Sequence, residues 1–148
     1  MNPFEECIQA LSNILGITLQ AEQGSRCKLK AEEISVQLDY LEPKKNLVMT
    51  SFLAEVPPGT FREEVFIAAL KDNAQQGTLG VFAYSDVTGQ IALQLFLAIS
   101  TQPERLAETL KQFIEKAIIW KNAIAGGNLR LVSQSAPSSG PSPLQFMR

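Results

Sequence analysis

Residues 34–40, which read Ile-Ser-Val-Gln-Leu-Asp-Tyr, alternate apolar and polar side chains without a break. Successive side chains of a β-strand point to opposite faces, so the apolar residues fall on one face and the polar residues on the other. A strand with one dry face and one wet face is typical of antiparallel sheets. This stretch therefore predicts a strand in an antiparallel sheet that is covered on one side.

Further strands are expected on both sides of this one. Residues 27–31 alternate in the same way, and residues 47–54 form a strand that carries apolar side chains on both faces. Two more strands are expected over 79–85 and 91–99, joined by a short turn that ends in glycine. The last strand is also apolar on both faces, so the second side of the sheet is expected to be partly covered.

Helices are predicted before, between and after these strands, over residues 3–15, 61–73 and 103–125. Thr60 occupies the expected N-cap of the middle helix, and Glu63 follows at the spacing of a capping box. The resulting order, α-β-β-β-α-β-β-α, predicts an α+β fold in which a twisted antiparallel sheet packs against helices.

The last helix has more apolar residues than one packed face requires. Its main stripe contains Leu106, Leu110, Phe113, Ala117, Trp120 and Ile124, and three further isoleucines fall outside that stripe. One small domain cannot bury this helix and both faces of the sheet unless something else covers part of them. The sequence therefore indicates a subunit interface, a bound peptide, or both. An extended peptide could also add to a free edge of the sheet.

The composition predicts one folded domain and a tail. The chain has 148 residues, of which 45% are hydrophobic and 19% are charged, which suits a single globular domain over residues 1–126. Residues 127–148 are different: between Ser133 and Pro143 there are five serines, three prolines and one glycine. Such a segment buries too little apolar surface to offset its ordering entropy, so a disordered tail is expected.

The sequence shows little catalytic chemistry. It contains no histidine, which excludes Ser/His and Cys/His triads, and its two cysteines cannot make a four-cysteine zinc site. Adjacent acidic pairs such as Glu63 and Glu64 point apart on a helix and do not form an acid–base pair. No catalytic residue, cofactor or metal is therefore expected, and the protein is not expected to be an enzyme.

Charge and hydropathy limit which partners and which cellular location are expected. The net charge is −2 and the pI about 5.2, which argues against nucleic acid as a partner. No signal peptide and no apolar stretch long enough to span a bilayer are recognised, so a cytosolic protein with no membrane span is expected. Cys7 and Cys27 are then expected to be reduced core residues.

Several segments together resemble one family. They are the helix ending Leu15-Gly16-Ile17, the strand start Gly24–Leu29, the alternating Ile34–Leu38, Pro57-Pro58-Gly59 before Phe61–Leu70, Gly77–Gly80, and the closing helix with Trp120. Over residues 4–125 the chain resembles the class I type III secretion chaperones, the Tir chaperone (CesT-like) family. The stretch from Pro57 to Leu70 is most similar to chlamydial members.

The resemblance implies a non-catalytic, cytoplasmic bacterial protein. Such chaperones bind the N-terminal, non-globular segment of a secreted effector or gatekeeper protein in extended form. They keep that segment secretion-competent without ATP. The resemblance also implies a homodimer, or a heterodimer with a second chaperone.

By position, the resemblance assigns two sets of residues, although ordinary core packing is the alternative for each of them. Client binding falls on Phe4, Ile8, Leu11, Phe52, Phe82, Tyr84 and Phe96. The dimer interface falls on Phe66, Leu70, Leu79 and Val81.

A different function remains open from the residues alone. A small non-catalytic α+β dimerisation or regulatory module would have the same core and the same lack of catalytic residues. The partner separates the two hypotheses, because a chaperone binds a segment that is disordered when free, whereas such a module binds a folded surface.

Overall fold

The computed structural model describes residues 2–130 and 132 and has the predicted order of elements. The helices are α1 (Pro3–Leu15), α2 (Thr60–Ala74) and α3 (Pro103–Ala125), with a short 3₁₀ turn over Glu42–Lys44. The strands are β1 (Arg26–Ala31), β2 (Ile34–Leu41), β3 (Asn46–Glu55), β4 (Val81–Ser85) and β5 (Gln90–Ala98). The predicted α+β class is therefore confirmed.

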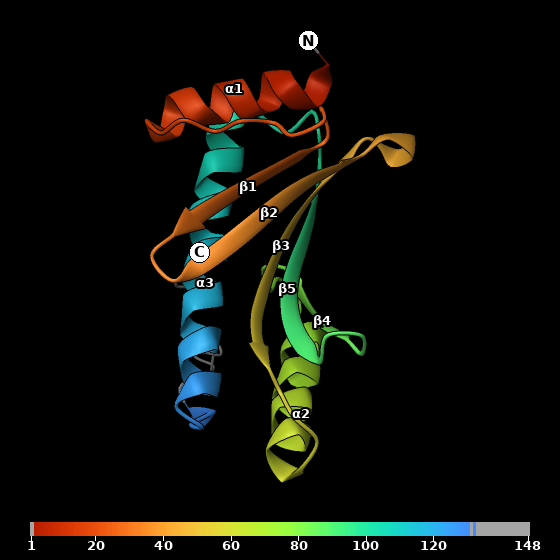
Figure 1. Ribbon diagram of the computed structural model, residues 1–148, viewed down its shortest axis with the longest axis vertical. Helices are drawn as coiled ribbons and strands as arrows, with labels where there is room; N and C mark the ends of the chain where they lie inside the picture. Colours follow the sequence, from red (N-terminus) through yellow and green to blue (C-terminus); the bar gives the residue numbers. More distant parts are fainter. Residues whose placement is uncertain (1, 131, 133–148) are drawn as a thin grey trace.

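The strands form one antiparallel sheet in the order β1-β2-β3-β5-β4. In Figure 1, α3 lies along one side of the sheet, and α1 crosses α3 near the N-terminal end of α3. Helix α2 lies at the opposite end of the molecule, beside the edge strand β4. The helices thus leave the other side of the sheet uncovered, and we call that side the open face.

Local signals explain the bounds of α1. Asn2 and Glu5 form a capping box, in which the Asn2 side chain accepts from the Glu5 amide at 2.7 Å and the Glu5 carboxylate accepts from the Asn2 amide at 3.0 Å. The helix ends at Gly16, which takes the left-handed conformation with φ 72°. The predicted helix over residues 3–15 is confirmed.

The start of α2 differs from the prediction. Gly59, and not Thr60, is the N-cap, and no side chain caps the helix. The Glu63 amide donates to the carbonyl of Gly59, so the helical hydrogen bonding begins one residue earlier than the capping-box spacing indicates. Gly59 has φ 145°, a conformation that glycine adopts without a steric penalty, and this lets the chain turn from the two prolines directly into the helix.

The core lies between the helix-covered face of the sheet and α1 and α3. The predicted stripe of α3 is buried throughout, and it meets buried side chains from every strand, among them Leu29, Val36, Met49, Phe82 and Leu93. Leu129 and Val132 also pack against this core. These two contacts lie past the expected domain boundary at residue 126, which stays a prediction. The expected disordered tail falls largely on residues 131 and 133–148, which lie outside the described residues.

Candidate functional site

The open face carries a patch of exposed apolar side chains at its centre. Phe52 on β3 and Phe96 on β5 are each 50% exposed, and Val81 on β4 is 44% exposed. Backbone register places Val48 beside Phe96 and Phe52 beside Ala92, and the row of Thr50 and Gln94 lies between these two rows of β3 and β5. Covering the exposed half of each phenylalanine contributes about 1 kcal/mol, which makes the patch a favourable contact for an apolar partner.

Polar side chains in the patch are largely satisfied within the chain. Gln94 donates from Nε2 to the Thr50 hydroxyl at 3.3 Å across β3 and β5, and Thr50 is itself buried. Val48 and Thr50 are buried although no helix covers them, whereas Phe52 on the same face of β3 is half exposed. A partner on this face therefore meets apolar surface without breaking a buried hydrogen bond.

One edge of the open face is charged. Arg26 on β1 pairs with Asp39 on β2, with 2.7 Å between Nε and Oδ1, and Gln37 donates to the other oxygen of Asp39 at 2.8 Å. The hydrogen bond and the charge of Asp39 raise the pKa of the Arg26 guanidinium above its ordinary value. The negative charge of Asp39 is therefore paired with Arg26 within the sheet.

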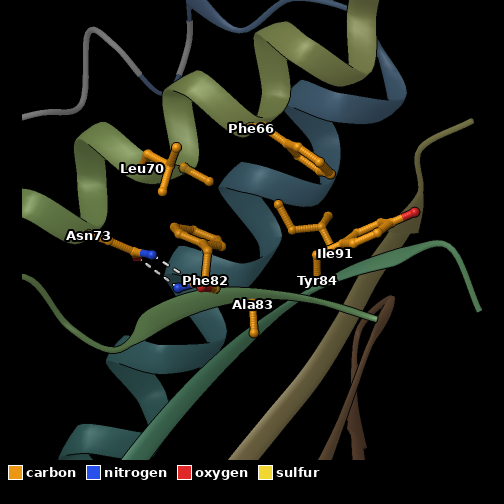
Figure 2. Close-up of a pocket in the computed structure, with 8 residues that line it drawn as sticks. Phe66, Leu70, Asn73, Phe82, Ala83, Tyr84 and Ile91 are labelled. Atoms are coloured by element: carbon orange, nitrogen blue, oxygen red, sulfur yellow. Dashed lines mark hydrogen bonds between the residues drawn. The ribbon is translucent and has the colours of Figure 1, made fainter. Parts of the chain in front are cut away.

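A second apolar site lies between α2 and β4, as Figure 2 shows. This pocket, which we call the α2–β4 pocket, has a volume of about 200 Å³. It is lined by Phe66, Ala69, Leu70 and Asn73 from α2, by Phe82, Ala83 and Tyr84 from β4, and by Ile91 from β5. The Phe66 and Tyr84 rings meet edge to face with centroids 4.9 Å apart, a favourable aromatic geometry.

Two polar side chains hold the walls of the α2–β4 pocket. Arg62 donates from Nε to the Val56 carbonyl at 2.8 Å and from Nη2 to the Tyr84 hydroxyl at 2.7 Å, and its guanidinium lies 5.1 Å from the Tyr84 ring centroid. Asn73 bonds both backbone groups of Phe82, accepting from its amide at 2.8 Å and donating to its carbonyl at 3.1 Å. Asn73 thus occupies the outer hydrogen-bonding edge of β4 at this residue.

Neither Arg62 nor Asn73 was predicted from the sequence. Both act across tertiary contacts, Arg62 with Tyr84 and Asn73 with Phe82. The exposed Ile67 on α2 was missed as well, because α2 lacks a clear apolar stripe and its residues give no periodic signal.

The predicted client-binding residues divide into two groups. Phe52 and Phe96 lie exposed on the open face, and Tyr84 is half-buried in the α2–β4 pocket. Phe4, Ile8 and Leu11 are 0–2% exposed on the face of α1 that joins the core, and Phe82 is 7% exposed with its ring 4.2 Å from that of Trp120. The side chains of these four are already covered by their own chain, so core packing accounts for them in this structure and their contact with a client stays a prediction.

The predicted dimer residues gather near α2 and β4 but do not form one surface. Phe66 and the 66% exposed Leu70 line the α2–β4 pocket. Val81 projects onto the open face, and Leu79 lies in a separate groove between the end of α2 and α3. Phe66, Leu70, Phe82 and Tyr84, which were expected to serve two functions, surround one pocket.

The described residues offer no reactive centre. Burial raises the pKa of the Cys7 and Cys27 thiols, which therefore hold their protons and are poor nucleophiles at neutral pH. Within residues 2–130 and 132, no three histidine, cysteine or acidic residues are grouped so that they could hold a metal ion.

None of the helices that the structure describes is long and apolar enough to cross a membrane.

The sequence matches the model of one protein family. The model of the Tir chaperone protein (CesT) family matches residues 6–121. No curated protein sequence matches the chain.

Solved structures resemble the fold over most of the chain. The HopA1–SchA chaperone–effector complex is 12% identical, covers 82% of this chain and 94% of its own, and has a TM-score of 0.67. The ExoT–SpcS complex from Pseudomonas aeruginosa is 16% identical, with coverages of 79% and 97% and a TM-score of 0.61. The Yersinia pestis type III secretion chaperone SycH, in complex with a fragment of YscM2, is 17% identical, with coverages of 78% and 97% and a TM-score of 0.61.

Proposed function

The chain belongs to the Tir chaperone protein (CesT) family, and from this premise we propose that it binds the extended N-terminal segment of a secreted effector or gatekeeper protein. It is a type III secretion chaperone and not an enzyme. The bound segment stays unfolded and secretion-competent, and binding uses no ATP. This activity takes place in the bacterial cytoplasm, before the client is secreted.

The open face is the observation that carries the proposal. Phe52 and Phe96 expose half of their surface on a sheet side that no helix covers, next to the exposed Val81. A folded domain of this size gains nothing from leaving three such side chains in water. An extended segment gains apolar anchors there and loses its freedom only on binding, which suits reversible capture of a disordered client.

A dimer through α2 and β4 completes the proposal. Leu70 and Ile67 are 66% and 53% exposed on the outer side of α2, and the α2–β4 pocket opens beside Leu70. A second copy that buries these side chains offsets the cost of association with apolar contact area. The same surface could instead receive a second, different chaperone, which makes a heterodimer the competing assembly.

Light scattering on size-separated protein tests the proposal, with the chain alone and co-expressed with candidate N-terminal segments. We expect a dimer near twice 16.2 kDa that gains an extended segment. A monomer that ignores every segment but captures a folded partner would contradict the proposal. That result would favour a dimerisation or regulatory module that recognises a folded surface.

A further inference from the structure

Strand β1 presents a row of basic side chains to the open face. Arg26, Lys28 and Lys30 alternate along the strand, and all three are exposed. Backbone register places Lys28 beside Gln37 and Lys30 beside Ser35, and Gln37 in turn lies beside Thr50 on the open face. Alternate residues of a strand are spaced by about 6.6 Å, so the side chains of Lys28 and Lys30 leave this edge strand at that interval.

These two lysines are the uncompensated charges of the row. Asp39, the acidic residue on this part of the open face, is already bound by Arg26 and Gln37. Glu32 and Glu33 occupy the adjacent turn, but no ion pair joins either of them to Lys28 or Lys30 within the described residues. In a chain of net charge −2, this places local positive charge beside the apolar patch.

A groove connects the two lysines to Phe52. It has a volume of about 320 Å³ and crosses the open face from β1 to β3. Its lining includes Lys28 and Lys30 at one end, Ser35, Gln37 and Thr50 along its length, and Phe52 at the other end. Lysine stems add apolar surface while the ammonium groups stay in water, so the groove combines an apolar floor with a cationic rim.

We propose that this groove selects client segments that carry acidic residues at alternate positions beside an apolar side chain that reaches across β2 to Phe52. The inference rests on the proposed function and adds the chemistry of the client to it. An extended peptide repeats its side chains on one face at the same interval as β1, so two carboxylates at positions i and i+2 meet Lys28 and Lys30 together. The apolar residue then covers the exposed half of the Phe52 ring.

A peptide suits this groove better than a nucleic acid. Two free lysines neutralise few phosphates, whereas protein sites for nucleic acid usually carry broad basic surfaces. Phe52 lies beside Ala92, and Val48 and Phe96 lie beyond the row of Thr50 and Gln94 on the same face, so the apolar surface near the groove matches side chains more than sugars and phosphates. Preferential binding of a single-stranded oligonucleotide would therefore contradict the proposal.

A peptide-display selection tests the inference and does not require the natural client. Random twelve-residue peptides are selected against the full-length chain, against K28E/K30E and against K44E/K111E. Lys44 and Lys111 are exposed, lie outside the groove and form no ion pair within the described residues, so the control changes the net charge equally. We expect acidic pairs at alternate positions to be enriched by the wild type and by the control, and to be lost with K28E/K30E.

Affinity measurements make the test quantitative. Fluorescence anisotropy at low salt is expected to show about tenfold weaker binding of the best acidic peptide to K28E/K30E, and less than twofold change for K44E/K111E. The neutral K28Q/K30Q variant should fall between them, and a peptide with lysines in place of its acidic pair should recover binding to K28E/K30E. Circular dichroism checks that each variant is folded.

Four results would overturn the inference. The first is peptide selection without acidic enrichment, and the second is equal loss of binding in the control variant. The third is preferential binding of a twelve-nucleotide single-stranded DNA that depends on Lys28 and Lys30. If natural N-terminal segments bind the wild type and K28E/K30E equally well, the chaperone function stands and the acidic selectivity is refuted.

Discussion

Arg62 donates a hydrogen bond of 2.7 Å from its guanidinium to the hydroxyl of Tyr84. The same side chain reaches the Val56 carbonyl, so one residue of α2 joins the β3–α2 connection to the edge strand β4. Its guanidinium also faces the rings of Tyr84 and Phe66 at 5.1 and 5.9 Å from their centroids. Arg62 therefore fixes the aromatic wall of the α2–β4 pocket by hydrogen bonding and by cation–π contact.

This arrangement predicts graded losses of stability. Tyr84→Phe removes one hydrogen bond and should lower the free energy of unfolding by about 1 kcal/mol, whereas Arg62→Met removes both bonds and the cation–π contact and should cost about 2 kcal/mol. Urea denaturation followed by circular dichroism measures both. Arg105→Met is the control, because Arg105 is exposed on α3. Variants of Arg62 and Tyr84 that unfold like the control would contradict the role assigned to Arg62.

The two phenylalanines Phe96 and Phe82 should respond differently to the same substitution. Phe96→Asp changes a half-exposed side chain on the open face, so we expect at least tenfold weaker client binding with a melting temperature lowered by only a few degrees. Phe82→Asp places a carboxylate against Trp120 in the core and should cost more than about 3 kcal/mol of stability. Thermal melts and client titrations distinguish them, and parallel losses in both variants would mark Phe96 as a core residue.

The elements could be predicted because their signals are local. The alternation over residues 34–40 requires only neighbouring residues, and α1 and α3 begin at prolines that suit a first helical turn. The prediction of Thr60 as the N-cap of α2 was wrong, because Gly59 adopts a backbone conformation that the capping-box pattern does not take into account.

The site could be predicted only in part, since an apolar stripe does not reveal what covers it. Phe4, Ile8 and Leu11 have the spacing of a binding face, but α3 supplies the cover within the same chain. Phe52 and Phe96 also belong to apolar strand faces in the sequence, but they remain exposed because no helix reaches their side of the sheet. The roles of Arg62 and Asn73 depend on contacts between α2 and β4, which the periodicity of the sequence does not reveal.

The outer side of α2 predicts a variant that separates subunits without unfolding them. Leu70→Asp places a charge on a side chain that is 66% exposed, so the folded chain should keep its stability while a dimer through α2 dissociates. Light scattering should then report a mass near 16.2 kDa. Val87→Asp, at a 90% exposed position in the β4–β5 turn, is the matched control. A dimer that persists in Leu70→Asp would place the subunit interface elsewhere.

The buried thiols predict a dependence of stability on pH. Burial raises the pKa of Cys7 and Cys27 in the folded chain, so their contribution is present below the ordinary thiol pKa of about 8.5. As the pH rises above that value the unfolded chain loses these protons first, and the free energy of unfolding should fall. Denaturation between pH 7 and 10 should show a steeper fall for the wild type than for Cys7→Ala/Cys27→Ala. Equal slopes would show that the thiols titrate alike in both states.

The C-terminal boundary of the domain predicts different outcomes for two truncations. Deletion of residues 133–148 removes a serine- and proline-rich segment and should leave the unfolding midpoint unchanged. Deletion of residues 129–148 also removes Leu129 and the buried Val132, which pack against the core, and should cost about 2 kcal/mol. Urea denaturation of both proteins beside the full chain decides the boundary. A large loss in the shorter deletion would mean that residues after Val132 stabilise the domain, whereas no loss in the longer one would return the boundary to residue 126.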